Sequence, residues 1–212
     1  MRRIRVLLAD DHHMFAEMLQ DLLTPRYEVV GTVTDGLALL ESARQLRPDL
    51  IVLDIGMPHL NGLDAGLQIK KAMPAVKLIF LTMNLDPYVV RQAIRNGASG
   101  FLLKQGTAKE LPEAIEKIVN GGSYVTSAAA RALEGLSELE PTNRDSRPEP
   151  TARQREVIQL LAEGQSMKQV ADTLKITPRT VAAHKYAVME MLQIKSSAEL
   201  VQYALKSGMI YH

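Results

Sequence analysis

Several polar side chains with chemical potential stand directly at the ends of short apolar runs. Three are carboxylates, one is a hydroxyl and one is an amine: Asp10, Asp11, Asp54, Thr82 and Lys104. A buried charge is unfavourable unless it is paired or binds a cation, so an acid at the end of an apolar run requires an explanation. Two or three carboxylates together suit Mg²⁺, which prefers oxygen ligands. One of the carboxylates can then act as a nucleophile and hold a phosphoryl group as an acyl phosphate.

The pattern of residues 1–123 explains how these side chains meet. Short apolar runs alternate with amphipathic stretches, which predicts an open parallel sheet covered by helices on both faces. The expected strands are residues 4–9, 27–33, 50–54, 77–82 and 100–104. The expected helices lie near residues 13–23, 36–46, 62–72, 87–96 and 108–120. Because sites in such sheets form beyond the carboxyl ends of the strands, we expect all the polar groups at one edge.

Each of these residues alone also has a structural explanation. Asp11 is placed to cap the helix after the first strand, and Thr82 is a β-branched residue of the kind that strands favour. His12 and His13 are explained more simply as the start of that helix than as metal ligands. Polar groups at corresponding ends of so many strands nevertheless favour a functional site over separate structural roles.

Glycine and capping patterns mark the helix ends. Gly97 and Gly121 follow expected helices, where residues in the left-handed conformation end a helix. Thr107 and Glu110 have the spacing of a capping box, so we expect Thr107 to cap the fifth helix.

Composition limits the class of protein. The chain has 212 residues, of which 46% are hydrophobic, so it can bury one large core or two small ones. It has no cysteine, which excludes disulfides and thiolate metal sites. No apolar run is long enough to cross a bilayer, and the apolar part of the N-terminus, VLLA, is too short for an export segment. We therefore expect a soluble cytoplasmic protein with no membrane partner.

The formal net charge of +1 hides an uneven distribution. Residues 1–125 hold 14 basic and 14 acidic residues, and residues 126–150 hold 3 basic and 5 acidic. Residues 151–212 hold 8 basic and 5 acidic residues, a surplus of +3. A basic surplus confined to one end of the chain suggests a nucleic-acid partner, although this surplus is modest.

The rest of the chain predicts a linker and a helical module. Residues 124–140 predict a short helix, and PTNRDSRPEP at 141–150 predicts a linker because it has three prolines and almost no apolar residues. Four helices are expected to begin near residues 152, 167, 178 and 197, with capping boxes at Thr151, Ser166 and Ser196. Only a tight turn separates the second helix from the third, which is the outline of a helix-turn-helix.

The motifs LLADDHHM, IVLDIGMP, IFLT and GFLLK resemble the receiver domain of a two-component response regulator, and the DxxMPxxNG pattern resembles the NarL/FixJ subfamily. The resemblance implies a flavodoxin-like (βα)5 doubly wound sheet with Asp54 as the phospho-acceptor. It implies Mg²⁺ held by Asp10, Asp11, Asp54 and the Gly56 carbonyl. Lys104 would clamp the phosphoryl group, Thr82 would move toward it, and Phe101 would change rotamer in response. Many relatives have tyrosine where this chain has Phe101, which has no hydroxyl to fix either position.

Residues 151–206 resemble the LuxR-type DNA-binding domain. The resemblance implies a recognition helix at 178–192 in the major groove and a fourth helix, 197–206, that mediates pairing of two copies. Helical spacing predicts that Val181, Val188 and Leu192 are core residues and that Met189 faces outward. The expected DNA-contacting residues are Lys168, Arg179, Thr180, Ala182, Ala183, Lys185 and Tyr186. The recognition face is therefore unusually poor in charge, since alanine can meet only a thymine methyl or a sugar edge.

These inferences combine into one hypothesis. Residues 1–123 form a receiver, residues 124–150 form a partly helical linker, and residues 151–212 form an all-α helix-turn-helix domain. The protein is expected to be a phosphorylation-controlled transcriptional regulator and not an enzyme. A histidine kinase would phosphorylate Asp54, and the C-terminal domain, whose recognition helix is hidden at rest, would be released to form a homodimer on double-stranded DNA.

Three alternatives stay open. A haloacid-dehalogenase-type phosphatase also uses an aspartate nucleophile with Mg²⁺, but it carries a second acid where this chain has Gly56. A constitutive DNA-binding protein would use the receiver only as a dimerisation surface. A C-terminal domain that has turned to binding protein would also explain the charge-poor recognition face.

Overall fold

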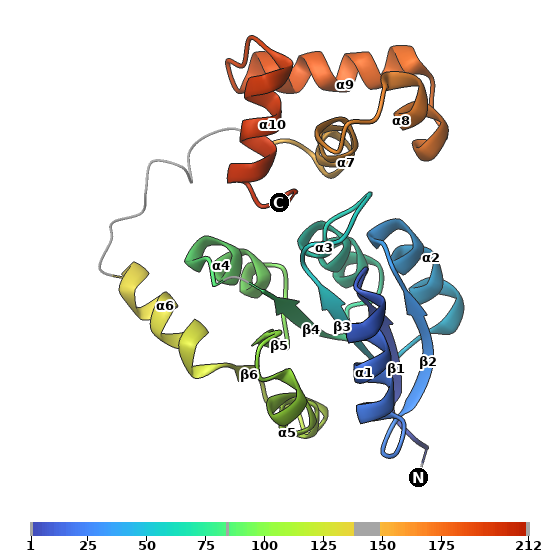
Figure 1. The fold of residues 1–212 in the computed structure, drawn as a ribbon, viewed down its shortest axis with the longest axis vertical. Coiled ribbons are helices and arrows are strands. Elements are labelled where there is room, and N and C mark those ends of the chain that lie inside the picture. The colour runs from blue at the N-terminus through green and yellow to red at the C-terminus, as the bar shows by residue number, and fades with distance from the viewer. Residues whose placement is uncertain (1, 84, 138–148, 211–212) are drawn as a thin grey trace.

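The structure is a computed structural model that describes residues 2–83, 85–137 and 149–210. The N-terminal part is a six-stranded parallel sheet in the order β2-β1-β3-β4-β5-β6 (Figure 1). Its strands are β1 (Arg5–Ala9), β2 (Glu28–Val33), β3 (Leu50–Asp54), β4 (Lys77–Thr82), β5 (Gly100–Leu103) and β6 (Tyr124–Val125). Its helices are α1 (His13–Leu23), α2 (Gly36–Leu46), α3 (Gly62–Ala72), α4 (Pro87–Arg95), α5 (Thr107–Val119) and α6 (Ser127–Ser137). The first five strands and five helices confirm the predicted order and lie close to the predicted bounds.

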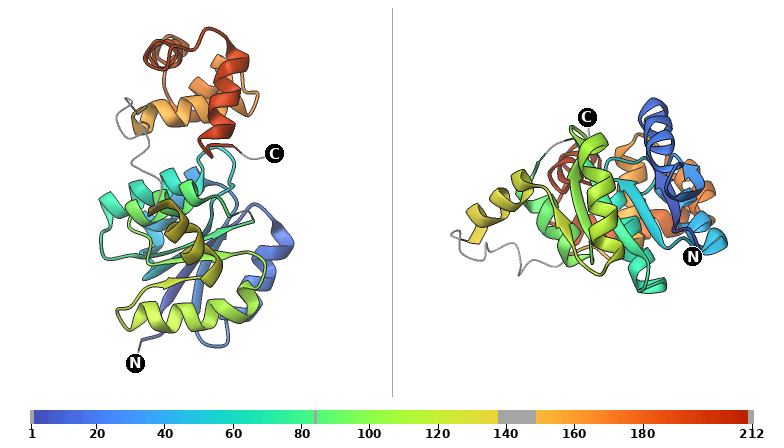
Figure 2. Two further views of the ribbon diagram at one scale, coloured as in Figure 1. Left: turned by 90° about the vertical axis from the view of Figure 1, so that its left-hand side faces the viewer. Right: turned by 90° about the horizontal axis from the view of Figure 1, so that it is seen from below.

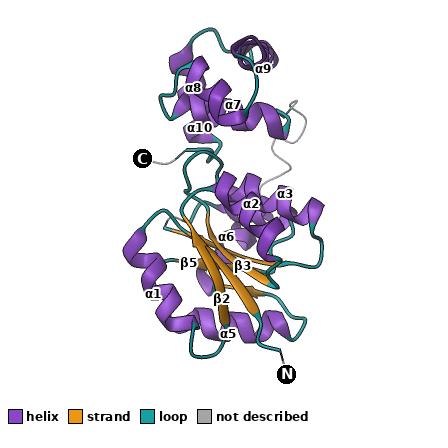
Figure 3. Cartoon of the chain, turned by 90° about the vertical axis from the view of Figure 1, so that its right-hand side faces the viewer, coloured by secondary structure: helices purple, strands orange, loops and turns teal. Residues whose placement is uncertain are grey.

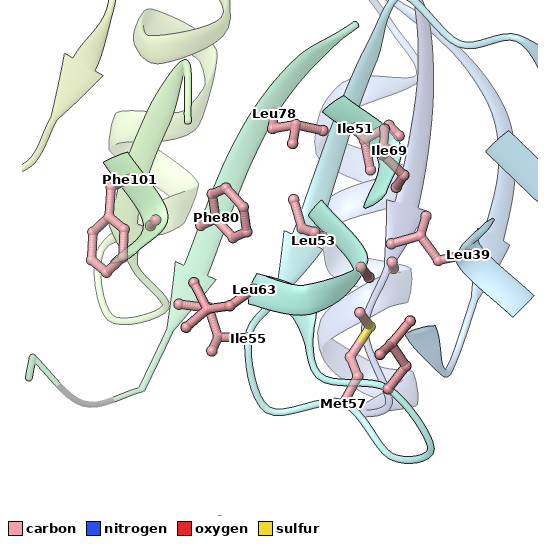
Figure 4. Close-up of a cluster of buried hydrophobic side chains, with 14 of the residues drawn as sticks. Leu39, Ile51, Leu53, Ile55, Met57, Leu63, Ile69, Leu78, Phe80 and Phe101 are labelled. Atoms are coloured by element: carbon pink, nitrogen blue, oxygen red, sulfur yellow. The ribbon is translucent and has the colours of Figure 1, made fainter. Parts of the chain in front are cut away.

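Helices cover both faces of this sheet, which explains why its strands read as continuous apolar runs. On one face, Leu7, Ile51 and Phe80 pack under α2, α3 and α4. Figure 4 shows Ile51 and Phe80 within this cluster. On the other face, Val6 and Val52 pack under α1 and α5. Successive residues of a strand point to opposite faces, so every residue of β3 is buried. Burying each large apolar side chain contributes about 2 kcal/mol, which fixes the strand ends that carry the site.

One glycine allows the chain to turn back beside the end of β3. A methyl group at Gly62 would overlap the carbonyl oxygen of Asp54. The Gly62 N–H also donates to the Ile55 carbonyl at 2.9 Å. Only a residue without a side chain permits this approach, so the loop between β3 and α3 closes tightly against the expected phospho-acceptor.

The prediction that Thr107 caps α5 is wrong. Gly106, at φ 94°, occupies the N-cap position, and Thr107 is the first helical residue. The Thr107 hydroxyl instead donates to the Leu103 carbonyl at 2.7 Å. Because Thr107 already lies inside the helix, its side chain turns back to β5. Gly97 and Gly121 do adopt the predicted left-handed conformation, at φ 85° and 90°.

The chain after α5 returns to the sheet, which the sequence pattern did not predict. β6 pairs with β5, and α6 packs against α4 at the same end of the sheet (Figure 2). Ala129 of α6 is fully buried in the core cluster that also holds Phe101. The predicted helix within 124–140 is therefore confirmed as α6, whereas most of the predicted linker at 141–150 lies outside the described residues.

The C-terminal part is a helical module (Figure 3). It consists of α7 (Ala152–Ala162), α8 (Met167–Leu174), α9 (Pro178–Met191) and α10 (Ser197–Lys206), which confirms the four predicted helix starts. Thr151 and Ser166 form complete capping boxes with Gln154 and Gln169. Ser196 caps α10 through the Glu199 N–H, but the Glu199 carboxylate accepts the Lys195 N–H and the Ser196 hydroxyl instead of closing the box. Lys175, at φ 54°, makes the tight turn between α8 and α9.

Candidate functional site

The sheet brings the predicted carboxylates together. Asp10 and Asp11 follow β1, and Asp54 ends the neighbouring strand β3. With His12, they offer ligand atoms that all lie within 4.8 Å of one another. Asp10 and Asp54 are only 1% and 4% exposed. The predicted meeting of these acids is therefore confirmed, and His12, which sequence reasoning set aside, stands with them.

Lys104 bridges two of the carboxylates. Its Nζ lies 2.8 Å from Asp10 Oδ2 and 2.9 Å from Asp54 Oδ2, and the residue is 7% exposed. Burial raises the pKa of the Asp54 carboxyl, the Lys104 ammonium opposes this rise, and the Asp10 carboxylate adds to it, so the pKa stays above its ordinary value. One ammonium does not balance this group of acids, and the remaining negative charge favours a cation.

Two carboxylate oxygens fit a metal ion. Within the part of the chain that the structure describes, Asp10 Oδ2 and Asp11 Oδ1 are buried and accept no well-formed hydrogen bond, although Lys104 and His12 stand at ion-pair distance. Unsatisfied buried oxygens are unfavourable, and a hard cation with oxygen ligands would satisfy them. The acidic cluster is thus consistent with Mg²⁺. Asp11 does not cap α1, because His12 occupies the N-cap position.

The two predicted switch residues lie beyond this cluster on β4 and β5. Thr82 ends β4 and is 4% exposed, and its carbonyl accepts the Lys104 N–H at 2.8 Å. Phe101 pairs in register with Phe80 and is fully buried. The Thr126 N–H donates to the Phe101 carbonyl at 3.1 Å, and the Thr126 hydroxyl accepts the Ala129 N–H at 3.3 Å. Thr126 therefore links the strand of Phe101 to the first turn of α6.

The helix-turn-helix presents the predicted DNA-contacting residues unevenly. Lys168, Arg179, Ala183 and Tyr186 are exposed, and Thr180, Ala182 and Lys185 are half-buried. Val181 and Val188 are fully buried, and Leu192 packs against the same core as Val188, which confirms the predicted core face. Met189 does not face outward as predicted, because it packs on the cluster around Val188 and Leu200.

The two parts of the chain meet through α7 and not through α9. Figures 1 and 3 place α9 on the side of its domain away from the sheet, with α7 facing the loop between β3 and α3. Gln159 of α7, 1% exposed, accepts the Asn61 N–H at 2.7 Å and donates to the Met57 carbonyl at 3.1 Å. The expectation that the recognition helix is hidden at rest is therefore wrong: the structure hides one face of α7.

Charged and apolar contacts extend this interface. Arg155 Nε lies 2.7 Å from Asp64 Oδ1, and Gln68 donates to Glu156 at 2.8 Å. Glu163 accepts the His59 N–H at 3.0 Å, and Leu37 of α2 packs against the core formed by α7, α8 and α9. Sequence reasoning missed this interface. The interface uses polar residues of α7 that look like ordinary surface residues of a helix, so their residue types do not distinguish them.

Comparison with known proteins agrees with this architecture. Residues 6–116 match the family described as response regulator receiver domain, and residues 151–204 match the family described as bacterial regulatory proteins, luxR family. The chain is 33% identical to the transcriptional regulatory protein MctR of Rhizobium johnstonii over 98% of this chain and 96% of that protein. It is 30% identical to the oxygen regulatory protein NreC of Staphylococcus carnosus, over 98% and 99% of the two chains.

Solved structures give the same result for the whole chain. RcsB from Salmonella enterica serovar Typhimurium, bound to a promoter in the presence of the phosphomimetic BeF₃⁻, superposes with a TM-score of 0.62 at 25% identity, over 98% of this chain and 99% of that one. The chain belongs to the NarL/FixJ-type response regulators, which join a receiver to a LuxR-type helix-turn-helix domain. It is a phosphorylation-controlled transcriptional regulator and not an enzyme, with a histidine kinase and DNA as its partners.

No helix in the described part of the chain combines the length and the apolar character needed to cross a membrane.

Proposed function

We propose that Asp54 accepts a phosphoryl group from the partner histidine kinase and that this event controls dimerisation and sequence-specific DNA binding. The observation that carries the proposal is the position of Asp54: a carboxylate 4% exposed, 2.9 Å from the Lys104 ammonium, beside two acids that each have one buried oxygen without a well-formed hydrogen bond. A carboxylate oxygen of Asp54 attacks phosphorus, the bond from phosphorus to the kinase imidazole breaks, and its electron pair remains on the imidazole nitrogen.

The residues around Asp54 have distinct roles in this proposal. Asp10, Asp11, Asp54 and the Gly56 carbonyl would hold Mg²⁺, which supplies positive charge to the phosphoryl oxygens when bound. Lys104 would turn from Asp10 toward a phosphoryl oxygen, and the Thr82 hydroxyl would hydrogen-bond another. Phe101 would then repack beneath α6, because the fully buried ring has neighbours on α4 and α6 in the same cluster.

The contact between α7 and the loop at 57–61 supports a route from Asp54 to the C-terminal domain. This loop begins directly after the expected Gly56 ligand, and Gln159 holds it at both ends through Met57 and Asn61. A new dianionic group on Asp54 changes the charge beside this loop, so we propose that the hold of α7 weakens. Because α9 already faces away from the sheet, release would change the freedom of the domain to pair through α10 and would not uncover the recognition helix.

The C-terminal domain would bind DNA as a pair of copies. We propose Lys168, Arg179, Thr180 and Lys185 as contacts to phosphate and Ala182, Ala183 and Tyr186 as contacts to base edges. RcsB has been solved as two dimers bound to two parallel DNAs, which supports the same arrangement here. Residues 1–123 would be the receiver and residues 151–212 the DNA-binding domain. The expected linker, 124–150, would both contribute β6 and α6 to the receiver and connect the two domains. We expect the protein to act in the cytoplasm.

Intact-mass spectrometry with acetyl phosphate and Mg²⁺ tests the acceptor. The wild type should gain one PO₃ unit, Asp54→Asn should gain none, and Asp21→Asn, which makes the same change on the exposed face of α1, should behave as the wild type. A PO₃ gain in Asp54→Asn would contradict the proposal.

DNA binding with and without beryllofluoride tests the control. Beryllofluoride with Mg²⁺ should raise the DNA affinity of the wild type and leave that of Asp54→Asn unchanged. Equal affinity of the wild type in both conditions would favour the constitutive alternative. Rapid hydrolysis of an aryl phosphate would favour the phosphatase alternative.

A further inference from the structure

The surroundings of the Lys104 ammonium include an aromatic ring that the proposed function does not use. Asp10 and Asp54 occupy two sides of Nζ, and His12 Nδ1 lies 3.4 Å away. The ring of Phe15 lies on a further side, with its centroid 4.9 Å from Nζ. This distance is within the range in which the negative face of an aromatic ring attracts a cation.

Phe15 is held in place independently of Lys104. It lies on α1 and packs against the core cluster beneath α1 and α5, which includes Leu19 and Leu111. The residue is only half-buried, so its ring forms part of the boundary between the site and solvent. A ring fixed by the core on one side presents a constant surface to the ammonium on the other.

From this geometry we infer that Phe15 is a positioning residue for phosphoryl transfer, acting through Lys104; the inference rests on the proposed function. The three donors of the ammonium already face Asp10, Asp54 and, at 3.4 Å, His12 Nδ1, and a further acceptor close to Asp54 would compete with the phosphoryl oxygens. An aromatic face attracts the cation without accepting a directed hydrogen bond. Phe15 thus keeps the ammonium beside Asp54 while leaving it free to donate to the incoming group.

The inference predicts a split between two binding constants. Lys104 faces the phosphoryl oxygens, whereas the expected Mg²⁺ ligands are carboxylates that Phe15 does not contact through this ring interaction. Loss of the ring face should therefore weaken capture of a phosphoryl analogue and spare binding of the metal. A residue that only maintained the fold would weaken both constants together.

The test uses the full chain and measures two affinities by calorimetry: Mg²⁺ alone, and beryllofluoride at saturating Mg²⁺. Phe15→Leu should bind beryllofluoride about three- to tenfold more weakly, the size expected for loss of one partly desolvated cation–π contact, with Mg²⁺ affinity unchanged. Phe15→Tyr should retain the wild-type value because it keeps the ring face. Phe15→Met, which also lacks a ring face, provides a second variant in case leucine packs poorly.

The chain offers a matched control. Tyr124 packs against the same core cluster and carries Lys117 over its ring at 6.0 Å, but it lies on β6 away from the acids. Tyr124→Leu should leave beryllofluoride affinity unchanged. Unchanged affinity in Phe15→Leu, a parallel fall of both constants, or a loss in Phe15→Tyr equal to that in Phe15→Leu would each overturn the inference. A wild type that bound no beryllofluoride would instead defeat the proposed function, and the inference with it.

Discussion

The acidic edge of the sheet and the exposed face of α9 differ in where their charged residues lie. At the sheet edge, acids and one lysine are buried together, and Asp10, Asp54 and Lys104 lie within ion-pair distance. On α9, the surface around Ala183 and Tyr186 is exposed and nearly uncharged, and the cations stand at its margins. At the sheet edge, the low dielectric of the protein interior strengthens each ionic interaction, so a few fixed charges are enough. On α9, each contact with a DNA phosphate is weak, so DNA affinity depends on how many such contacts form. Under the proposed function, this difference predicts that one copy of the receiver suffices for its chemistry while the DNA-binding domain gains from pairing.

The largest effect is expected from a substitution that removes positive charge from the buried acidic site. Lys104→Met leaves Asp10 and Asp54 without their shared cation, and removing one partner of a buried ion pair costs about 3–5 kcal/mol. We expect the unfolding free energy of the metal-free variant to fall by about 3 kcal/mol and Mg²⁺ to restore part of it. Chemical denaturation with and without Mg²⁺ measures this effect. A variant as stable as the wild type in EDTA would show that the acids are not held by charge balance.

The second prediction tests whether the two regions communicate through α7. Gln159→Ala removes the side chain that hydrogen-bonds Asn61 and Met57, and lost hydrogen bonds of this kind cost about 0.5–1.5 kcal/mol each. The domains should separate more readily, so hydrogen exchange at 57–61 should rise and DNA affinity without beryllofluoride should increase about five- to tenfold. Gln154→Ala, on the same helix but in its capping box, is the control. Unchanged DNA affinity in Gln159→Ala would show that the interface does not restrain DNA binding.

The third prediction adds a positive charge at an uncharged position of the recognition face of α9. Ala183→Lys places a cation on the exposed recognition face. From this proposed base-facing position, a long lysine side chain should reach a neighbouring phosphate. The added phosphate contact should raise affinity for any DNA sequence and make the slope of log affinity against log salt steeper by about 0.9. Fluorescence anisotropy at several salt concentrations measures both. An unchanged slope would show that a cation at position 183 does not neutralise a phosphate, against the placement of this face of α9 on DNA.

The smallest expected effect is a pH dependence of the interface. Burial raises the pKa of Glu163, although hydrogen bonds from Gln159 and the His59 N–H oppose this rise. When the C-terminal domain is released, the pKa of Glu163 should return to its ordinary value. A pKa that is higher in the docked state means that docking binds a proton, so docking strengthens as the pH falls through this range and weakens as it rises. Small-angle scattering between about pH 7 and about pH 5 should show more docked protein at the acidic end. Glu163→Gln should remove the part of this dependence that comes from Glu163, whereas a dependence that survives intact would show that Glu163 is not its source.

The sequence was sufficient for the elements whose signal is local. The β3 run and the helices around it are periodic and long enough to be recognised, and the rule that sites lie beyond strand ends brought Asp10, Asp54 and Lys104 together. The sequence pattern did not predict β6, because a strand of two residues is too short to show hydrophobic periodicity. The error at Thr107 arose because the capping-box spacing does not distinguish a cap from the first helical residue when a left-handed glycine precedes it.

Contacts between distant parts of the chain were beyond sequence reasoning. Gln159 and Asn61 are 98 positions apart, and neither residue type signals a buried interface. Glutamine on a helix is usually a surface residue, and only the docked structure shows that it is 1% exposed. The same holds for Phe15, whose place on α1 is that of any core-facing aromatic residue until the position of Lys104 is known.

The pairing of β6 with β5 has a practical consequence for dividing the chain. A fragment ending at residue 123 would leave the edge of β5 that faces away from β4 without a partner strand and would uncover the cluster that contains Ala129. Unpaired strand edges next to apolar surface invite self-association. A fragment that continues to residue 137 keeps the β5–β6 pairing and the packing of α6. It is therefore the shorter form whose behaviour in solution should reflect the intact regulator.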